Sequence, residues 1–386
     1  MVGAGKAGEA MARACVDCLR EKIYRGMVIC KQAPETPLYG NVHLLKGDHP
    51  VPGENSLRST EMLVSLLEEV KPDDLVLCLI SGGGSALMTQ PADGVKLHDL
   101  QHLTQQLLGC GASIQEINTL RKHLDLIKGG GLARRVYPAR LTGLILSDVV
   151  GDALDMIASG PTAGDPTTYQ DACAILERYN LWEDTPLGIQ KRLLEGCDGL
   201  HAETTKPGDA CLENVQNIIL ASNRTAVQAA SEAGRRFGYT VREYRCPVTG
   251  EAREAAVLLV GEFKKLLETE KRPFLLAAGG ETTVTLHGKG KGGRNLEFAL
   301  ACVQELKGLE NVRLITLATD GEDGTTGAAG AAVTGQTWEE ARRKGLEPQA
   351  YLAQNDSYTF FRQLDRLIIT GPTGTNVNDL VLLAAD

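Results

Sequence analysis

Aromatic residues are scarce in this sequence. Phe, Trp and Tyr make up only 4% of the 386 residues. Because stacking platforms for bases or sugars are built from aromatic rings, this composition argues against an extended surface of that kind. The formal net charge of −9 likewise argues against nucleic acid and anionic membranes as partners. A small anionic substrate is still possible, since it needs only a local positive field.

Long apolar runs are also lacking. No stretch is apolar for long enough to cross a bilayer, and no charged leader is followed by an apolar segment. We therefore expect a cytoplasmic protein that is neither exported nor inserted in a membrane.

The ten cysteines show no disulfide framework. The one C-x-x-C pair, Cys15 and Cys18, has no second pair with which it could form a zinc site. This usage favours a reducing compartment.

The order of apolar patterns predicts the fold class. Short apolar runs alternate with longer amphipathic ones, which is typical of a parallel sheet with crossover helices. The strands are expected at residues 27–30, 75–80, 141–147, 215–222, 273–279, 312–319 and 366–370. The helices are expected at residues 8–23, 56–70, 97–111, 113–127, 224–238 and 251–270.

A chain of 386 residues is long for a single core, so two domains are expected. The segment 196–214 is polar and has no strand pattern, which places the boundary there. The predicted domains are residues 1–212 and 213–386, and the second contains a compact mixed αβ unit at 273–386.

The sequence "GAGKAG", Gly3 to Gly8, fits the dinucleotide fingerprint G-x-G-x-x-G. That fingerprint requires a preceding strand, for which Met1 and Val2 leave no room, and an acidic residue after the second strand, where Lys31 stands. The first strand is therefore expected to be missing, and dinucleotide binding is disfavoured. Lys6 within the turn suits a phosphate or carboxylate contact, or is an exposed helix-start lysine.

A second glycine loop, "SGGGSA", begins directly after the apolar run 75–80. In an open parallel sheet this position is the carboxyl edge, where ligands bind. The backbone N–H groups of Gly82, Gly83 and Gly84 are unobstructed by side chains, and Ser81 and Ser85 add hydroxyls. The loop predicts an anion-binding nest, with a plain tight turn as the alternative.

Acidic residues follow two other predicted strands. Asp148 and Asp152 come after 141–147, and Asp320 and Asp323, with Glu322 between them, come after 312–319. Carboxylates at strand ends suit Mg²⁺, which binds one or two of them and completes its shell with water and phosphate. We expect a metal site or a general base here, with Asp148, Asp152 and Asp320 as candidate ligands. Helix caps are the alternative.

The segment "GKGKGGRNLEFAL" is a basic glycine-rich loop that ends at a predicted helix start. Arg294 can hold a carboxylate or phosphate bidentately, and Asn295 is the expected helix cap. A further loop, "TGPTGTNVNDL", supplies hydroxyl and amide donors. His49, in "KGDHPVPGENS", is expected either to assist substrate binding or to belong to a structural turn, and His123 to serve packing.

Together these loops provide what phosphoryl transfer requires: backbone N–H groups, two acid clusters, a lysine and an arginine that stabilise charge. The residues alone predict a phosphate-handling, Mg²⁺-dependent enzyme. Two alternatives are an NAD(P)-dependent hydroxypyruvate reductase that uses "GAGKAG", and a metabolite-binding regulator without catalysis.

The order of the motifs is more specific than any one of them. The motifs "GAGKAG", "SGGGSAL", "NTLRKHLDLIKGGGLA", "LILSDVVGD", "IASGPT", "AGGETTV", "GGRNLEFAL", "TDGEDG" and "TGPTGTNVNDL" span the whole chain. In this order they resemble the glycerate 2-kinase family, whose members have a C-terminal MOFRL domain. The resemblance implies an α/β fold with a Rossmann-like parallel three-layer domain, a mixed-sheet MOFRL domain, and a cleft between them.

The activity that the resemblance implies is transfer of the γ-phosphoryl group of ATP to the 2-hydroxyl of D-glycerate, with Mg²⁺. Lys6 would contact phosphoryl oxygens or substrate, Asp148 would be the base or a metal ligand, and Arg294 would stabilise the phosphoryl charge or hold the carboxylate. Nucleotide or substrate would contact Gly3, Gly5, Ser81, Gly82, Gly83, Gly84, Ser85, Gly293, Asn295, Thr373, Gly374 and Asn376.

Similar proteins carry a helix and a strand ahead of "GAGKA", so this chain is expected to lack both. A monomer or a homodimer is expected, with no nucleic-acid or membrane partner.

Overall fold

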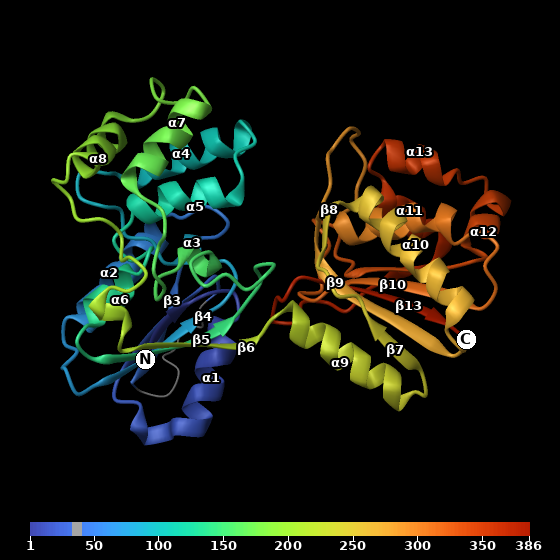
Figure 1. The fold of residues 1–386 in the computed structure, drawn as a ribbon, viewed down its shortest axis with the longest axis horizontal. Coiled ribbons are helices and arrows are strands. Elements are labelled where there is room, and N and C mark those ends of the chain that lie inside the picture. The colour runs from blue at the N-terminus through green and yellow to red at the C-terminus, as the bar shows by residue number, and fades with distance from the viewer. Residues whose placement is uncertain (33–40) are drawn as a thin grey trace. The chain divides into compact units, whose positions relative to one another are not determined.

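The computed structural model describes residues 1–32 and 41–386. These residues form two compact units, which are described separately below (Figure 1). The first unit comprises Met1–Ser147 and Asp152–Leu220, and the second comprises Asp148–Gly151 and Ala221–Asp386. The division therefore falls after residue 220, later than the predicted boundary at 212.

The first unit is built on a sheet with strand order β3-β2-β1-β4-β5-β6. Its strands are β1 (Val2–Ala4), β2 (Gly26–Cys30), β3 (Val42–Lys46), β4 (Leu75–Ile80), β5 (Arg140–Leu146) and β6 (Val215–Ala221). The pairings β1–β2, β1–β4, β2–β3 and β4–β5 are all parallel. This order is that of doubly wound nucleotide-binding sheets, so the predicted Rossmann-like fold is confirmed. β6 belongs to this sheet, although the predicted boundary assigned it to the second domain.

The strand that was predicted to be missing is present. β1 has only three residues, all buried, and it pairs on both sides, with Val2 opposite Met27 of β2 and opposite Cys78 of β4. A central strand that is hydrogen-bonded along both edges does not need a long apolar run of its own, which is why the sequence pattern missed it. Gly3 is required there, because a Cβ would lie 2.3 Å from the carbonyl oxygen of Leu79.

The helices of the first unit form two groups (Figure 1). α1 packs on β2 and β4, and α2 packs on β2 and β3. α4, α5, α7 and α8 pack together around a core of Leu103, Leu107, Leu120, Leu176 and Leu193. The bounds are α1 (Gly8–Leu19), α2 (Glu54–Leu67), α3 (Gly84–Leu87), α4 (Leu97–Gly109), α5 (Ile114–His123), α6 (Gly131–Val136), α7 (Tyr169–Arg178) and α8 (Leu187–Cys197). Short 3₁₀ turns lie at Arg20–Lys22, Ile157–Ser159 and Ala210–Leu212.

Local sequence explains where two of these helices begin. Ser113 accepts a hydrogen bond from the backbone N–H of Glu116, whose carboxylate in turn accepts from the N–H of Ser113. Thr168 and Asp171 form the same reciprocal arrangement at α7. Each pair satisfies N–H groups that a helix start leaves without an intrahelical partner.

The second unit contains a mixed sheet with strand order β12-β11-β10-β13-β9-β7, and β8 also pairs with β9. β13 is antiparallel to β10 and β9, whereas β7 and β8 run parallel to β9. Its strands are β7 (Thr240–Glu243), β8 (Val248–Glu251), β9 (Phe274–Thr283), β10 (Val312–Ala318), β11 (Gly330–Thr334), β12 (Leu367–Ile368) and β13 (Asp379–Ala385). The predicted mixed sheet is confirmed, although the strand expected at 366–370 has only two residues.

Helices cover both faces of this second sheet (Figure 1). α9 packs against β7, β9 and β13, and α10 and α11 pack together on the other face. The core to which α10 and α11 contribute contains Phe263, Phe274, Phe298, Phe360 and Phe361. The bounds are α9 (Asn223–Arg236), α10 (Ala252–Thr269), α11 (Arg294–Glu305), α12 (Thr337–Arg343), α13 (Pro348–Ala353) and α14 (Ser357–Leu364).

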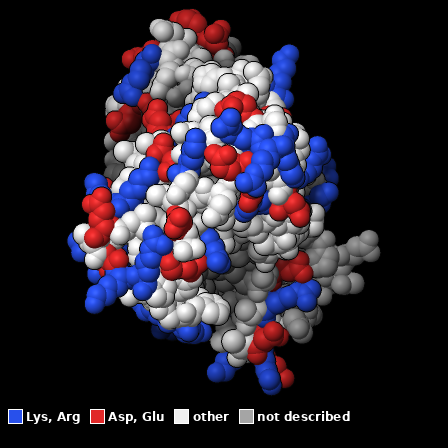
Figure 2. Space-filling model, turned by 90° about the vertical axis from the view of Figure 1, so that its right-hand side faces the viewer, with Lys and Arg blue, Asp and Glu red and all other residues white. Residues whose placement is uncertain are grey.

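The face of the molecule drawn in Figure 2 carries acidic and basic side chains interspersed. The second unit has exposed ion pairs such as Arg235–Glu243 and Arg313–Asp386, and pairs of that kind add little to stability. No helix in the described part of the chain is long and apolar enough to cross a bilayer.

Candidate functional site

Two glycine loops meet at the carboxyl edge of the first sheet. Residues 5–7 follow β1, and residues 81–83 follow β4, which lies next to β1. The backbone N–H of Lys6 donates to the carbonyl of Gly82 at 2.9 Å. The strand order reverses between β1 and β4, and open α/β sheets bind ligands at such a point. The sheet topology therefore makes this edge the first candidate site.

Several predicted residues in these loops have structural partners of their own. Ser81 is only 2% exposed, and its Oγ accepts a hydrogen bond from the N–H of Ala7 at 3.1 Å. A Cβ on Gly5 would lie 1.9 Å from that Oγ. Gly3 and Gly5 thus allow close packing against β4 and the residue that follows it. Lys6, which directly follows Gly5, has an exposed side chain.

The remaining residues of the second loop lead into the short helix α3. Gly83 has φ +80°, and a Cβ there would lie 2.8 Å from the ring of His49. Ser159 donates to Asn118 Oδ1 at 3.0 Å, so Ser85 must be the donor in its own hydrogen bond with Ser159. Whether this loop contacts a ligand stays a prediction, but its backbone lies beside the exposed Lys6.

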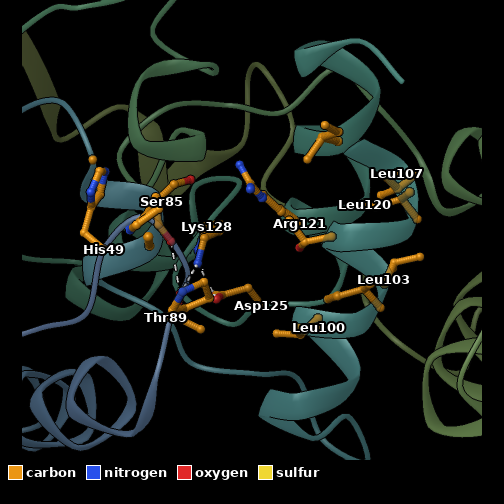
Figure 3. A pocket seen from close by; sticks show the side chains of 17 residues that line it. His49, Ser85, Thr89, Leu100, Leu103, Leu107, Leu120, Arg121, Asp125 and Lys128 are labelled. Carbon is orange, nitrogen blue, oxygen red and sulfur yellow. Dashed lines mark hydrogen bonds and ion pairs between the residues drawn. The ribbon is translucent and has the colours of Figure 1, made fainter. Parts of the chain in front are cut away.

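A pocket of about 180 Å³ lies next to this loop and is bounded by α4 and α5 (Figure 3). Its lining includes Gly83, Ser85, His49, Arg121 and Lys128. Burial, followed by the charges of Lys6 and Lys31, lowers the pKa of His49 to about 4. His49 is therefore uncharged at neutral pH, and its predicted role in substrate binding stays a prediction.

Lys128 is buried within the lining of the pocket, at 4% exposure. Its ammonium group contacts Asp125 Oδ2 at 2.5 Å and donates to the carbonyl of Met88 at 3.0 Å and to Thr89 Oγ1 at 3.1 Å. Burial lowers its pKa, and the carboxylate of Asp125 opposes that effect. Lys128 thus forms a charge-compensated pair that fixes the pocket wall. His123, as expected, is buried and packs against Tyr169.

The second candidate site surrounds Arg294, the first residue of α11. Its Nε donates to Asp379 Oδ2 at 2.6 Å, its Nη2 to Asp379 Oδ1 at 3.3 Å, and its Nη1 to Glu281 Oε1 at 2.6 Å. Glu281 lies near the end of β9, and Asp379 begins β13. These bonds use three of the five N–H groups of the guanidinium, which leaves two for another acceptor.

Asp323 caps α11 from outside the helix. Its carboxylate accepts hydrogen bonds from the N–H groups of Asn295 at 3.0 Å and Leu296 at 2.8 Å. Asn295 was expected to be the cap, but it lies within the helix, and its Nδ2 donates to Asp379 at 2.9 Å. A Cβ on Gly293 would lie 2.4 Å from the carboxyl carbon of Asp323. Gly293 is therefore needed because the capping carboxylate occupies that space.

Burial shapes the ionisation of this cluster. It raises the pKa of Asp323 to about 6, and it also raises the pKa values of Asp379 and Glu281. Burial alone would lower the pKa of Arg294, but Asp379 and Glu281 outweigh that effect and raise it. The arginine is thus held charged between carboxylates that are themselves unusually easy to protonate.

The other predicted acids are divided between the two units. Asp148 belongs to the second unit, where its charge contributes to the raised pKa of Glu281. Asp320 contributes in the same way to the pKa of Asp379, whereas Asp152 belongs to the first unit. Within residues 1–32 and 41–386, no three His, Cys, Asp or Glu side chains converge as a metal-binding group.

The loop 370–378 is held against the end of β10. Thr373 donates through its N–H to the carbonyl of Asp320 at 3.1 Å and through its Oγ1 to that of Thr319 at 2.6 Å. Asn376 Oδ1 accepts from the N–H of Asn378, and Gly374 is exposed with φ +76°. The hydroxyl of Thr373 is thus already engaged, so any ligand contact by this loop stays a prediction.

Sequence reasoning missed Arg121, Glu281 and Asp379. Glu281 and Asp379 lie inside strands of the sheet, and only the tertiary pairing of β9 with β13 places them beside Arg294. Arg121 directly follows Leu120 on the buried side of α5. A charged residue adjoining an apolar helix face was the available signal.

The comparisons with known proteins cover nearly the whole chain. Residues 1–194 match a family described as a domain of unknown function, DUF4147, and residues 274–379 match the MOFRL family. A D-glycerate 2-kinase from Thermotoga maritima is 40% identical over 385 residues, which cover 99% of this chain and 89% of the relative. The chain belongs to the glycerate 2-kinase family.

The fold agrees with that membership. A crystal structure of a glycerate kinase from Thermotoga maritima matches with a TM-score of 0.90 at 39% identity, covering 100% of this chain and 91% of that one. A relative from Agrobacterium vitis, named as a candidate hydroxypyruvate reductase, is 40% identical over 98% of this chain and 85% of its own. Within the glycerate 2-kinase family, therefore, relatives of similar identity carry two different activity names.

Proposed function

We propose that this protein is an ATP-dependent kinase that phosphorylates the 2-hydroxyl of D-glycerate, giving 2-phosphoglycerate and ADP. The observation that carries the proposal is the exposed Lys6 of the first glycine loop, whose backbone N–H donates to Gly82 of the second loop at the switch point of the first sheet, in a chain of this family. Phosphoryl transfer depends mainly on positioning and on stabilising negative charge. Lys6 and the backbone N–H groups of Gly82 and Gly83 would supply such stabilisation, whereas the N–H of Gly84 already donates to the carbonyl of Ser81 at 3.2 Å.

The second unit contributes a different set of groups. Arg294 has two N–H groups left for a phosphoryl oxygen or for the glycerate carboxylate, because three are used by Glu281 and Asp379. Asp148 acts either as the base that accepts the hydroxyl proton or as a metal ligand. Both roles require an ionised carboxylate.

Mg²⁺ fits the residues present only as part of a complex with nucleotide. Mg²⁺ typically takes one or two carboxylates and keeps waters and substrate phosphates as its other ligands. Asp148 and Asp320 are the carboxylates in the second unit that would hold it, and Asp152 is the candidate in the first. When bound, the ion neutralises phosphate charge.

One structural observation supports the alternative of an NAD(P)-dependent reductase, and two others oppose it. β1 supplies the strand that a dinucleotide loop requires before its first glycine. However, Gly3 and Gly5 face Leu79 and Ser81 rather than a ligand space, and Lys31 follows β2 where an acid would hold a ribose. The structure therefore favours a loop whose first two glycines serve strand packing.

The deciding experiment compares two reactions of the purified protein. ADP release is measured with D-glycerate, ATP and Mg²⁺, and NAD(P)H oxidation is measured in parallel with hydroxypyruvate. We expect ADP release that requires glycerate and metal, with a product that enolase accepts directly, as 2-phosphoglycerate would be. NAD(P)H oxidation without ADP release would overturn the kinase assignment in favour of the reductase.

A further inference from the structure

The pocket beside the second glycine loop has two chemically different ends (Figure 3). Its inner end is formed by aliphatic side chains of α4, α5 and the residue after α5, each at most 2% exposed: Leu103, Leu107, Ile117, Leu120 and Leu124. Its other end carries Ser85, Gly83, His49 and the cation Arg121. A ligand that fills this pocket must itself have an apolar part and a polar, anionic part.

The charge of Arg121 is not compensated by any carboxylate in the described residues. Its one hydrogen bond there is a long contact of Nη1 with Asn118 Oδ1, at 3.4 Å. The neighbouring cation, Lys128, is by contrast neutralised by Asp125. Arg121 is half-buried, and this burial lowers the pKa of its guanidinium, which reflects the cost of removing part of its hydration. An anion would remove that cost, because buried charges are stable only when paired.

The direction of the side chain agrees with this role. In Figure 3 the guanidinium of Arg121 extends from α5 toward Ser85, while Leu103, Leu107 and Leu120 lie on the helix side of the pocket. The cation is thus placed between the apolar end and the glycine loop. That loop in turn contacts the Lys6 turn through the hydrogen bond between Lys6 and Gly82.

We propose that this pocket binds the purine nucleotide, with the base at the leucine-lined end and a phosphate on Arg121 and the Gly83–Ser85 backbone. This inference rests on the proposed function, which requires one nucleotide and one hydroxy acid. D-glycerate carries an oxygen on each of its three carbons, so it has no apolar part to place among leucines. A nucleotide has a planar ring at one end and phosphates at the other, in the same order as the pocket lining.

The first test measures ADP binding by calorimetry, without glycerate, so that catalysis is not needed. Arg121→Gln removes the charge and should weaken ADP about tenfold to a hundredfold, because a hydrogen bond between charged groups is lost. Arg121→Lys keeps the charge but not the planar fork, so it should weaken ADP less. The control is Arg178→Gln on α7, whose side chain is 64% exposed and pairs with Glu116. It should leave ADP affinity unchanged.

The second test separates the two ends of the pocket. Thr104→Phe, at the half-buried lining position on α4, should fill the base end and weaken ADP while leaving inorganic pyrophosphate affinity unchanged. Arg121→Gln should weaken both ligands. Thermal unfolding of each variant shows whether it is folded. If Arg121→Gln does not fold, Arg121→Lys is used in its place.

The outcomes distinguish this inference from the proposed function. If wild-type protein releases ADP with glycerate but Arg121→Gln changes only the KM for glycerate, the kinase assignment is supported. The pocket would then bind glycerate, and the nucleotide assignment of the pocket would be wrong. If ADP binding depends on Arg121 while no glycerate-dependent turnover occurs, the nucleotide pocket is supported and the proposed reaction is contradicted. If the wild-type protein does not bind ADP, or if Arg121→Gln leaves ADP affinity unchanged, the nucleotide pocket is refuted.

Discussion

The two units present opposite chemistries at their candidate sites. The first has a parallel sheet, glycine loops, the exposed Lys6, and Arg121, which pairs with no carboxylate in the described part of the chain. The second has a mixed sheet, and its arginine is held by Glu281 and Asp379. The first site therefore presents cations and backbone N–H groups, whereas the second is rich in carboxylates.

The difference suggests a division of tasks in phosphoryl transfer. A positive field with backbone N–H donors suits phosphate binding, while carboxylates suit metal binding and proton removal. The predictions below test this division, beginning with the largest expected effect.

Asp148→Asn should cut kcat by at least about a hundredfold, because removing a general base costs that much or more. If Asp148 is a base, the Mg²⁺ concentration needed for half-maximal rate should stay unchanged, and if it is a ligand, that concentration should rise. Steady-state rates over a Mg²⁺ series measure both. The exposed Asp73→Asn is the matched control. A near-wild-type rate would remove Asp148 from the mechanism.

Arg294→Ala should cut kcat by about a hundredfold and also lower the free energy of unfolding by about 2–3 kcal/mol. The second effect arises because Asp379, whose side chain is 8% exposed, loses its ion pair. Urea titration and initial rates measure the two quantities. Arg313→Ala breaks an exposed pair with Asp386 and should leave both nearly unchanged. Full stability in Arg294→Ala would show that the cluster does not need its arginine.

Lys6→Met should lower kcat by about a hundredfold, because the proposed role of Lys6 is to stabilise phosphoryl charge. Stability should not change, because the side chain is exposed. Arg294→Ala, by contrast, should lower both kcat and stability, so the two variants together compare the two units directly. Rates and melting temperatures of Lys6→Met are compared with those of Lys22→Met, another exposed lysine of the first unit. Equal rates in both variants would contradict the role of Lys6.

Ser85→Asp should weaken ligand binding at least about tenfold, because it adds a negative charge beside the anion-binding backbone. The fold should survive, since Ser85 is only partly buried. Ser65→Asp, at an exposed position of α2, adds the same charge elsewhere. Apparent affinities for ATP and glycerate that both match those of the wild-type protein would refute the prediction that the loop of residues 81–85 binds an anion.

Asp323→Asn should flatten the dependence of stability on pH. Burial raises the pKa of Asp323 from 3.8 to about 6, so the folded protein binds more protons in this window and stability falls as pH rises through it. Glu281 and Asp379 act with the same sign, so the slope should diminish rather than vanish. Chemical denaturation at several pH values between 4 and 7 provides the measurement. An unchanged slope would mean that Asp323 titrates normally.

Much of the architecture could be predicted from the sequence. The fold class and the family are confirmed, and β4, β5, β6 and β10 lie within a residue of their predicted positions because each is rich in leucine, isoleucine or valine. Most of the short strands escaped prediction. β1, β3, β7, β8 and β11 have at most five residues each, too few for a pattern to stand out from the loops around them. The seven-residue β13 was missed as well.

The candidate sites could be predicted only in part. Lys6 lies in a glycine-rich loop and Arg294 directly follows one, whereas Arg121, Glu281 and Asp379 lie within regular elements that no such loop adjoins. Their importance comes from neighbours distant in the chain. Register between β9 and β13 places Asp379 opposite Gly280, one residue from Glu281, and no local pattern encodes that pairing.

The contact between Gly5 and Ser81 has a consequence for how this family can diverge. Because a Cβ on Gly5 would overlap the Ser81 hydroxyl, a side chain at position 5 would displace the second loop, and loss of that hydroxyl would leave the N–H of Ala7 without its acceptor. Substitutions at the two positions should therefore be epistatic. Ser81→Gly should partly rescue Gly5→Ala, and lineages that alter one glycine loop should carry a compensating change in the other.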